Sequence, residues 1–223
     1  VPVPRYRTRV PPAANLRFGM RRGLMSGTAT LHWAPTTSGY EARFEARLVG
    51  LLLLRQTSQG SIDGAGLAPD RFTDQRARRA AIAANFQRDA GKLTFSAHDA
   101  EYPLAAGMQD RLSWMIQLAA IAEADPASLA PGTEIALKVA GARGDLSIWR
   151  LRVRGVETLQ IGETTVPTVH ISRPARGLHD SGAEIWLDPK RHHLPVRLVL
   201  NAPAEGDGRA PLELELQSIA MPP

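Results

Sequence analysis

The sequence has no cysteine, few aromatic residues and no long hydrophobic run. With no cysteine among its 223 residues, it has no disulfide, thiolate metal ligand or cysteine nucleophile, although this fits a reducing or an oxidising compartment. Aromatic residues make up 5% of the chain, too few for the stacking surface that nucleic-acid binding combines with a basic stripe. The longest nearly apolar run, Leu112 to Ala122, is far shorter than the roughly 20 residues of a membrane span. We therefore expect no nucleic-acid partner and no transmembrane segment.

Motifs for catalysis and cofactor binding are also lacking. No serine lies in the Gly-x-Ser-x-Gly turn of hydrolases. Gly64-Ala65-Gly66 lacks the lysine and the following helix of a phosphate-binding loop. Acidic residues such as Glu41 and Glu45 alternate with apolar ones, which is typical of the solvated face of a strand rather than of paired catalytic carboxylates. We expect no cofactor.

The six histidines form no convincing metal site. The nearest group is Asp188 followed by His192-His193. Adjacent residues on a strand point to opposite faces, so only one of these histidines could join Asp188 in a site. A turn at Asp188-Pro189 with the histidines opening the next strand explains the group without a metal, and we expect none.

The proline and arginine content distinguishes a short N-terminal segment from the domain that follows it. The 27 Lys+Arg outnumber the 22 Asp+Glu by a mild +5, and the arginines are spread through the chain. Residues 1–13 are rich in Pro and Arg, whereas residues 14–221 show no linker and predict a single β domain. The first segment would suit an extended spacer after a membrane anchor upstream or a disordered end, and both alternatives stay open.

A period of two residues dominates the chain and predicts a mainly β fold. From Tyr40 to Leu48 apolar residues alternate strictly with charged ones, which is the pattern of a strand with one buried and one solvent-exposed face. Similar runs recur, separated by turn signals such as Ser38-Gly39 and Gly144-Asp145. We predict about ten or more antiparallel strands in a strongly curved sheet or partly open barrel.

One segment departs from this pattern and predicts a central helix over about 108–124. Asp110 to Ala124 has no Gly or Pro and is rich in Leu, Met and Ala. Its apolar residues occupy two faces, so it should be covered on more than one side. Such a helix would either line a cavity or fill the core.

Several phrases resemble the exported bacterial family of domain of unknown function 3108, over nearly the whole chain. They are Gly27-Thr28-Ala29-Thr30-Leu31-His32-Trp33, Gln56-Thr57-Ser58-Gln59-Gly60, Gly66-Leu67-Ala68-Pro69-Asp70-Arg71-Phe72, Ala84-Asn85-Phe86, Gln109-Asp110-Arg111-Leu112-Ser113-Trp114, Ile185-Trp186-Leu187-Asp188 and Leu194-Pro195-Val196-Arg197. The resemblance implies an exported, periplasmic β-rich protein. It implies no catalytic residues.

Two groups of residues are candidates for ligand binding. The first is Arg71, Arg76 and Arg78 with Asn85, which could hold phosphate or carboxylate groups; alternatively, they keep an exposed hairpin soluble. The second is Gln109, Asp110 and Trp114 at the start of the predicted helix, where Asp110 is most simply an N-cap. Arg143-Gly144-Asp145 spells an adhesion tripeptide but sits where a hairpin turn is needed.

Three functions follow from these observations. The leading one is a non-enzymatic cell-envelope domain that binds an amphiphilic or polymeric ligand, a lipid or polysaccharide, in a groove between sheet and helix. The second is a structural or protein-interaction module that uses a sheet edge. The third is a hydrolase, for which Asp110, Asp188 and His192 would be the first residues to test. Oligomeric state is left open.

Overall fold

The computed structural model describes residues 3–175, 180–201 and 210–221. In these ranges the chain forms fifteen strands, one α-helix and two short 3-10 helices. The strands are β1 (Ala14–Arg22), β2 (Met25–Pro35), β3 (Gly39–Leu48), β4 (Leu51–Asp63), β5 (Gly66–Arg76), β6 (Ile82–Gln87), β7 (Lys92–Phe95), β8 (Tyr102–Pro103), β9 (Gln109–Asp110), β10 (Glu134–Ala140), β11 (Leu146–Ile161), β12 (Thr164–Arg173), β13 (Ala183–Asp188), β14 (Leu194–Leu200) and β15 (Leu212–Ala220). The helices are α1 (Ser113–Ala124), η1 (Pro126–Leu129) and η2 (Pro189–Arg191).

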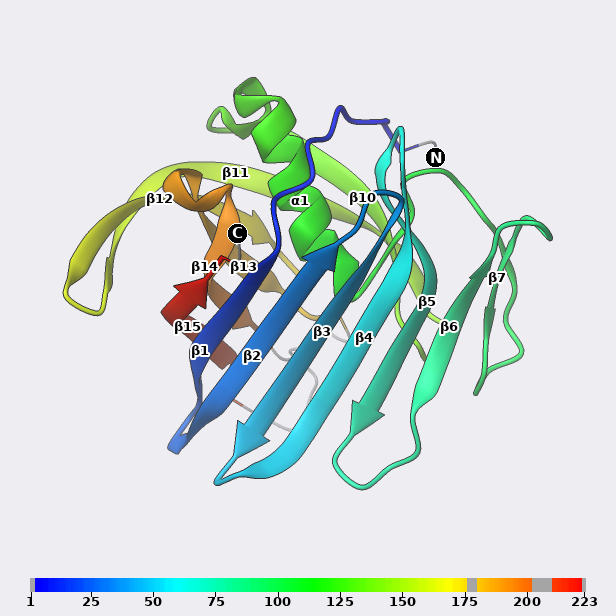
Figure 1. Ribbon diagram of the computed structural model, residues 1–223, viewed down its shortest axis with the longest axis horizontal. Helices are drawn as coiled ribbons and strands as arrows, with labels where there is room; N and C mark the ends of the chain where they lie inside the picture. The colour runs from blue at the N-terminus through cyan, green and yellow to red at the C-terminus, as the bar shows by residue number, and fades with distance from the viewer. Residues whose placement is uncertain (1–2, 176–179, 202–209, 222–223) are drawn as a thin grey trace.

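All the described strands belong to a single curved sheet, which confirms the predicted mainly β, antiparallel fold. Their order is β8-β7-β6-β5-β4-β3-β2-β1-β15-β14-β13-β12-β11-β10-β9. Apart from β8 and β9, which form the two ends of the sheet, strands that are consecutive in the chain are neighbours in the sheet. β1 pairs with β15, so the N-terminal and C-terminal halves join side by side. Apart from the two-residue parallel bridge of β9 with β10, the pairs are antiparallel. The sheet wraps round into a barrel that stays open between β8 and β9 (Figure 1).

The alternating patterns of the sequence set which face of each strand is buried. In β3, Tyr40, Ala42, Phe44 and Ala46 are buried, while the charged residues between them are not. The inner faces of the other long strands contribute to the same hydrophobic cluster. Burial of this continuous apolar surface is the main stabilisation of the fold.

Helix α1 lies inside the curve of the sheet and packs against β5, β9 and β14 (Figure 1). It begins at Ser113 rather than near residue 108, because Gln109 and Asp110 are held in β9 by pairing with β10. Every residue from Ser113 to Ala122 is buried, and the apolar ones lie within the main cluster or beside it. The helix therefore fills the core along its buried length rather than standing beside an open cavity.

Two glutamine side chains, one from α1 and one from β9, bind the β4–β5 turn and the start of β5. Gln117 Oε1 accepts from Leu67 N at 2.8 Å, and Gln117 Nε2 donates to Ala65 O at 2.7 Å. Gln109 Nε2 donates to Leu67 O at 2.7 Å. Gly66 lies between, with a φ of +99°, and a Cβ there would come within 2.3 Å of Gln117 Oε1. The turn thus needs glycine both for its backbone angle and for the close approach of the helix.

The two edges of the sheet are short and partly covered. Strands β8 and β9 have two residues each, and Pro103 in β8 has no N–H for another strand. Tyr102 OH donates to Gly144 O at 3.0 Å, which joins β8 to the β10–β11 turn across the opening. Gly144 has a φ of +88°, in agreement with the predicted turn. None of the helices in the described ranges combines the length and apolar character needed to cross a membrane.

The N-terminal segment, described from Val3 on, has no regular secondary structure but lies against the domain. Arg9 N donates to Ala120 O of α1 at 2.8 Å. Trp33 Nε1 donates to Pro11 O at 3.0 Å, and Ala136 N donates to Tyr6 OH at 2.8 Å. The segment therefore covers one side of the helix and accepts hydrogen bonds from two donors of the domain.

Deleting residues 1–12 is expected to lower the thermal unfolding midpoint. The deletion leaves the buried Trp33 indole N–H and the Ala136 N–H without their acceptors, at about 3 kcal/mol together, or roughly 6 to 12 °C for a chain of this size. Differential scanning calorimetry measures the midpoint. Deletion of residues 1–4, which removes none of these contacts, is the control. Equal midpoints for the two deletions would contradict the prediction.

Candidate functional site

The structure distributes the predicted ligand-binding residues over three places. Arg71 and Asn85 lie on neighbouring strands and bind each other, with Arg71 Nη1 donating to Asn85 Oδ1 at 2.7 Å. Arg76 and Arg78 are exposed at and just after the end of β5. The remaining three are buried around the start of α1: Gln109, Asp110 and Trp114. The seven residues therefore do not converge on one pocket.

Asp110 is the centre of a fully buried hydrogen-bond network. Its Oδ1 accepts from Leu112 N and Ser113 N at 2.8 Å each, and its own N–H donates to Ser113 Oγ at 2.9 Å. Its Oδ2 accepts from Ser58 Oγ at 2.5 Å. With the proton of Ser58 used in this way, Tyr40 OH donates to Ser58 Oγ at 2.9 Å. Asp110 thus caps the turn that leads into α1, whereas the N-cap position of the helix itself is Leu112 and not Asp110 as predicted, because Asp110 is held in β9.

Burial raises the pKa of Asp110 to about 6, despite the hydrogen bonds from Ser58, Ser113 and Leu112 that favour the charged form. Burial also raises the pKa of Tyr40, and the nearby Asp110 charge adds to this shift. Asp110 and Ser58 are both 0% exposed. A carboxyl and a hydroxyl so enclosed have no route to a substrate, so the pair serves the fold.

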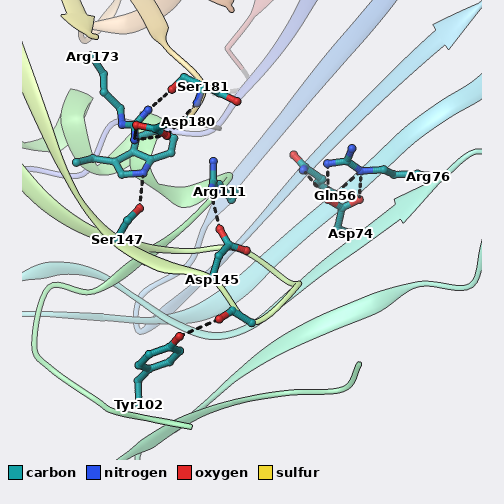
Figure 2. A network of polar contacts seen from close by, with 12 residues as sticks. Gln56, Asp74, Arg76, Tyr102, Arg111, Asp145, Ser147, Arg173, Asp180 and Ser181 are labelled. Carbon is teal, nitrogen blue, oxygen red and sulfur yellow. Dashed lines mark hydrogen bonds and ion pairs between the residues drawn. The ribbon is translucent and has the colours of Figure 1, made fainter. Parts of the chain in front are cut away.

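A second polar cluster surrounds Trp149 on β11. The guanidinium of Arg173 lies 4.4 Å from the Trp149 ring centroid and that of Arg111 lies 5.0 Å from it. Trp114 of α1 packs on the same residue, with ring centroids 5.2 Å apart. Arg173 binds Asp180 at 2.8 Å and Arg111 binds Asp145 at 2.6 Å, as Figure 2 shows. Each arginine here has a carboxylate partner, so this cluster holds the start of α1 and leaves no free charge for a ligand.

The histidine pair lies elsewhere than predicted. His192 and His193 have φ of 52° and 53° and precede β14 instead of opening it, so they do not point to opposite faces as strand residues would. Both contact Glu123 near the end of α1: His193 Nδ1 lies 2.5 Å from Oε1 and His192 Nδ1 lies 3.4 Å from Oε2. The Asp188 carboxylate binds Arg191 and Lys190 N instead. In the described residues no group of three such ligands is arranged to hold a metal.

This placement removes the arrangement that a hydrolase based on Asp110, Asp188 and His192 would need. Asp110 lies before the first residue of α1, and His192 contacts Glu123 near its last. A helix of 12 residues is roughly 18 Å long. The carboxyl and the imidazole therefore stand at opposite ends of the core, too far apart to act together.

Free positive charge gathers in a hollow where the two ends of the sheet approach each other. The hollow has a volume of about 320 Å³ and is lined by Asp74, Arg76, Arg79, Ala80, Ile82, Ala97 and Arg143. Asp74, nearly buried, binds Arg76 Nε at 3.3 Å and Gln56 Nε2 at 3.4 Å, as Figure 2 shows. Within the part of the chain that the structure describes, Arg79 and Arg143 have no acidic partner and no side-chain hydrogen bond. We call this set the arginine hollow.

The arginine hollow includes Arg76 from the predicted set but not Arg71 or Arg78 as lining residues. Arg79 belongs to the same arginine-rich stretch of the sequence, so the sequence indicated this segment without indicating Arg79 itself. The sequence predicted Arg143 only as part of a hairpin turn. Its place beside Arg79 results from closure of the sheet, which no local pattern indicates.

Asp110→Asn is expected to gain stability relative to the wild type as pH rises from 4 to 8. A folded pKa of about 6 against an ordinary value near 3.8 means that the carboxyl favours the folded state below pH 4 and loses that contribution as pH rises through 6. The loss is about 3 kcal/mol. Asparagine keeps an acceptor for Leu112 N and Ser113 N but carries no charge.

Urea unfolding at a series of pH values measures this difference between the two proteins. Asp110→Ala is the control, because it removes the charge and also the cap, and should be less stable than Asp110→Asn at every pH. A difference between wild type and Asp110→Asn that stays constant from pH 4 to 8 would show that Asp110 titrates normally.

Comparisons with known proteins agree with this fold. The model of a family described as "Protein of unknown function (DUF3108)" matches residues 14–213. The crystal structure of a β-barrel-like protein of domain of unknown function DUF1849 from Brucella abortus is similar, with a TM-score of 0.62 and 11% identity over 96% of this chain and 100% of that chain. At that identity the likeness shows the fold alone.

The crystal structure of MucB matches with a TM-score of 0.34 and 14% identity over 95% of this chain and 54% of that chain, too low to support an argument. No curated protein sequence matches. Since the family model covers most of the chain, this protein belongs to the DUF3108 family of proteins of unknown function.

Proposed function

We propose that this protein is a non-enzymatic, periplasmic domain of the cell envelope that binds the anionic group of an amphiphilic or polymeric envelope ligand in the arginine hollow. The observation that carries the proposal is the pair Arg79 and Arg143, two guanidinium groups that face one hollow and have no acidic partner among the described residues. Guanidinium groups bind phosphate and carboxylate through paired hydrogen bonds.

The size and position of the arginine hollow support a small charged group rather than a whole ligand. Its volume of about 320 Å³ is at the lower end of ligand pockets, enough for a head group. The filled interior leaves the apolar part of a ligand outside the barrel. The groove between sheet and helix that the sequence predicts is occupied by the packed faces of α1.

The interaction-module alternative receives less support from the sheet. Strand addition requires an exposed edge of several residues, whereas β8 and β9 have two residues each and Tyr102 bridges the opening.

Removing the two unpartnered arginines is expected to weaken binding of a soluble anionic lipid. The probe is dihexanoylphosphatidylglycerol below its micelle concentration, measured by isothermal titration calorimetry against its zwitterionic phosphatidylcholine counterpart. Loss of two charge-assisted hydrogen-bonding groups in Arg79→Ala/Arg143→Ala should weaken binding by at least about tenfold. An oligomer of galacturonic acid in a parallel titration tests a carboxylated polymer.

Arg17→Ala/Arg152→Ala is the matched control. These two arginines are exposed on the outer face of β1 and β11 and have no ion pair among the described residues. The control variant therefore loses the same two positive charges as Arg79→Ala/Arg143→Ala. Equal weakening in both double variants would show attraction by overall charge alone. Absence of binding by the wild type to both anionic probes would overturn the proposed function.

A further inference from the structure

Exposed apolar side chains gather at two neighbouring hairpin tips. Seven large apolar residues of the described chain are exposed, and five of them lie in the β1–β2 and β3–β4 turns and the strand residues next to them. They are Leu24 (106% exposed), Met25 (52%), Val49 (90%), Leu51 (69%) and Leu53 (39%). We call this set the apolar tips. Single exposed leucines are ordinary on protein surfaces, but such a concentration is not.

The apolar tips lie at the same end of the sheet as the arginine hollow. In an antiparallel meander the turns β1–β2, β3–β4 and β5–β6 all fall at one end, as Figure 1 shows along its lower edge. Ala77 N donates to Leu53 O at 2.7 Å, so the β5–β6 turn that carries Arg79 adjoins the β3–β4 hairpin. Apolar and cationic residues thus form one continuous rim.

The three turns of this rim carry positive charge and no acidic residue, and the carboxylate of the arginine hollow is that of Asp74. Residues 22–28, 48–54 and 76–83 contain four arginines and no Asp or Glu: Arg22, Arg76, Arg78 and Arg79. Only Arg76 among them binds a carboxylate in the described chain, that of Asp74. Such a rim is complementary to a surface that is both anionic and able to accept leucine side chains.

The folding of these turns does not require their apolar residues. Turns favour Gly, Asn and Asp, and Val49 stands at a φ of 48°, a region that a β-branched residue rarely adopts. Leu24 and Val49 bury almost nothing against the described residues. Their apolar side chains therefore contribute little to the stability of that part of the domain, and their presence is better explained by contact with a partner.

We propose that the apolar tips insert into the interfacial layer of an anionic lipid bilayer, with Arg78 and Arg79 on the lipid head groups. The inference rests on the proposed function and makes bilayer lipid the source of the anionic group. Leu24 and Val49 protrude instead of lining a groove, and protruding side chains fit a fluid layer better than a rigid protein surface. Apolar insertion and attraction of arginines to anionic lipids strengthen each other.

Replacing three tip residues is expected to abolish most vesicle binding while leaving head-group binding intact. In a flotation assay, the wild type should bind vesicles of phosphatidylcholine mixed with phosphatidylglycerol and not vesicles of phosphatidylcholine alone. Leu24→Ser/Val49→Ser/Leu51→Ser should bind the mixed vesicles at least about tenfold more weakly. Since these side chains are exposed, the variant should fold normally and still bind dihexanoylphosphatidylglycerol.

Val156→Ser is the matched control, because Val156 is 75% exposed on β11, away from the rim. It should bind vesicles like the wild type. Vesicle binding by the triple variant equal to that of Val156→Ser would overturn the docking proposal, and so would a wild type that binds the soluble lipid but no vesicles. In both cases the arginine hollow would stand as a binding site. A wild type that binds neither the soluble anionic lipid nor the galacturonic acid oligomer would instead overturn the proposed function.

The emission of a dye attached at the tip reports insertion directly and separates it from effects of a substitution on folding. Because the chain has no cysteine, Val49→Cys and Val156→Cys can each carry one polarity-sensitive dye. Emission from position 49 should shift to the blue on mixed vesicles, and emission from position 156 should not. A shift at position 49 that depends on protein concentration without vesicles would show a second copy of the chain covering the tips and would overturn the proposal.

Discussion

The structure depends on burying one helix, over its first ten residues, inside one curved sheet. A helix with water on no side must satisfy every polar group it brings into the core, because an unpaired buried donor or acceptor costs about 1 to 3 kcal/mol. Asp110 does this for the turn at the helix start, and Gln117 does it in the middle by pairing with the backbone of the β4–β5 turn. Among the described side chains near the helix, Gln109 Oε1 and Ser128 Oγ are the buried polar atoms left without a partner.

The filled core determines where a ligand can be bound. The helix occupies the space that open barrels use for a cavity, and the polar groups at its start are bonded to one another: Asp110 to Ser58, Arg111 to Asp145 and Arg173 to Asp180. The charges without partners are outside this core. A ligand can therefore bind at the arginine hollow and the apolar tips, both on the rim, and not at the buried carboxyl.

The sequence predicted the architecture well because each strand carries its own signal. Alternation from Tyr40 to Leu48 is local, and it sufficed to place β3 and its buried face. Features set by contacts between distant segments were not predictable in this way. The helix begins at Ser113 because Gln109 and Asp110 pair with β10, and His192 and His193 leave the strand pattern because both adopt left-handed backbone angles. The arginine hollow joins Arg79 and Arg143 for the same reason, since only closure of the sheet brings their turns together.

The start of the helix and the arginine hollow are mechanically connected. Asp110 holds the turn that leads into α1, and the next residue, Arg111, binds Asp145 in the β10–β11 turn at 2.6 Å. Tyr102 holds the same turn from β8 through Gly144 O. Arg143 lies in this turn, so its position is held by one contact from the residue after β9 and one from β8 at the far edge of the sheet. Since the sheet itself stays open between β8 and β9, the Tyr102 contact joins its two edges in place of strand pairing and brings the turn that carries Arg143 towards the edge near Arg79.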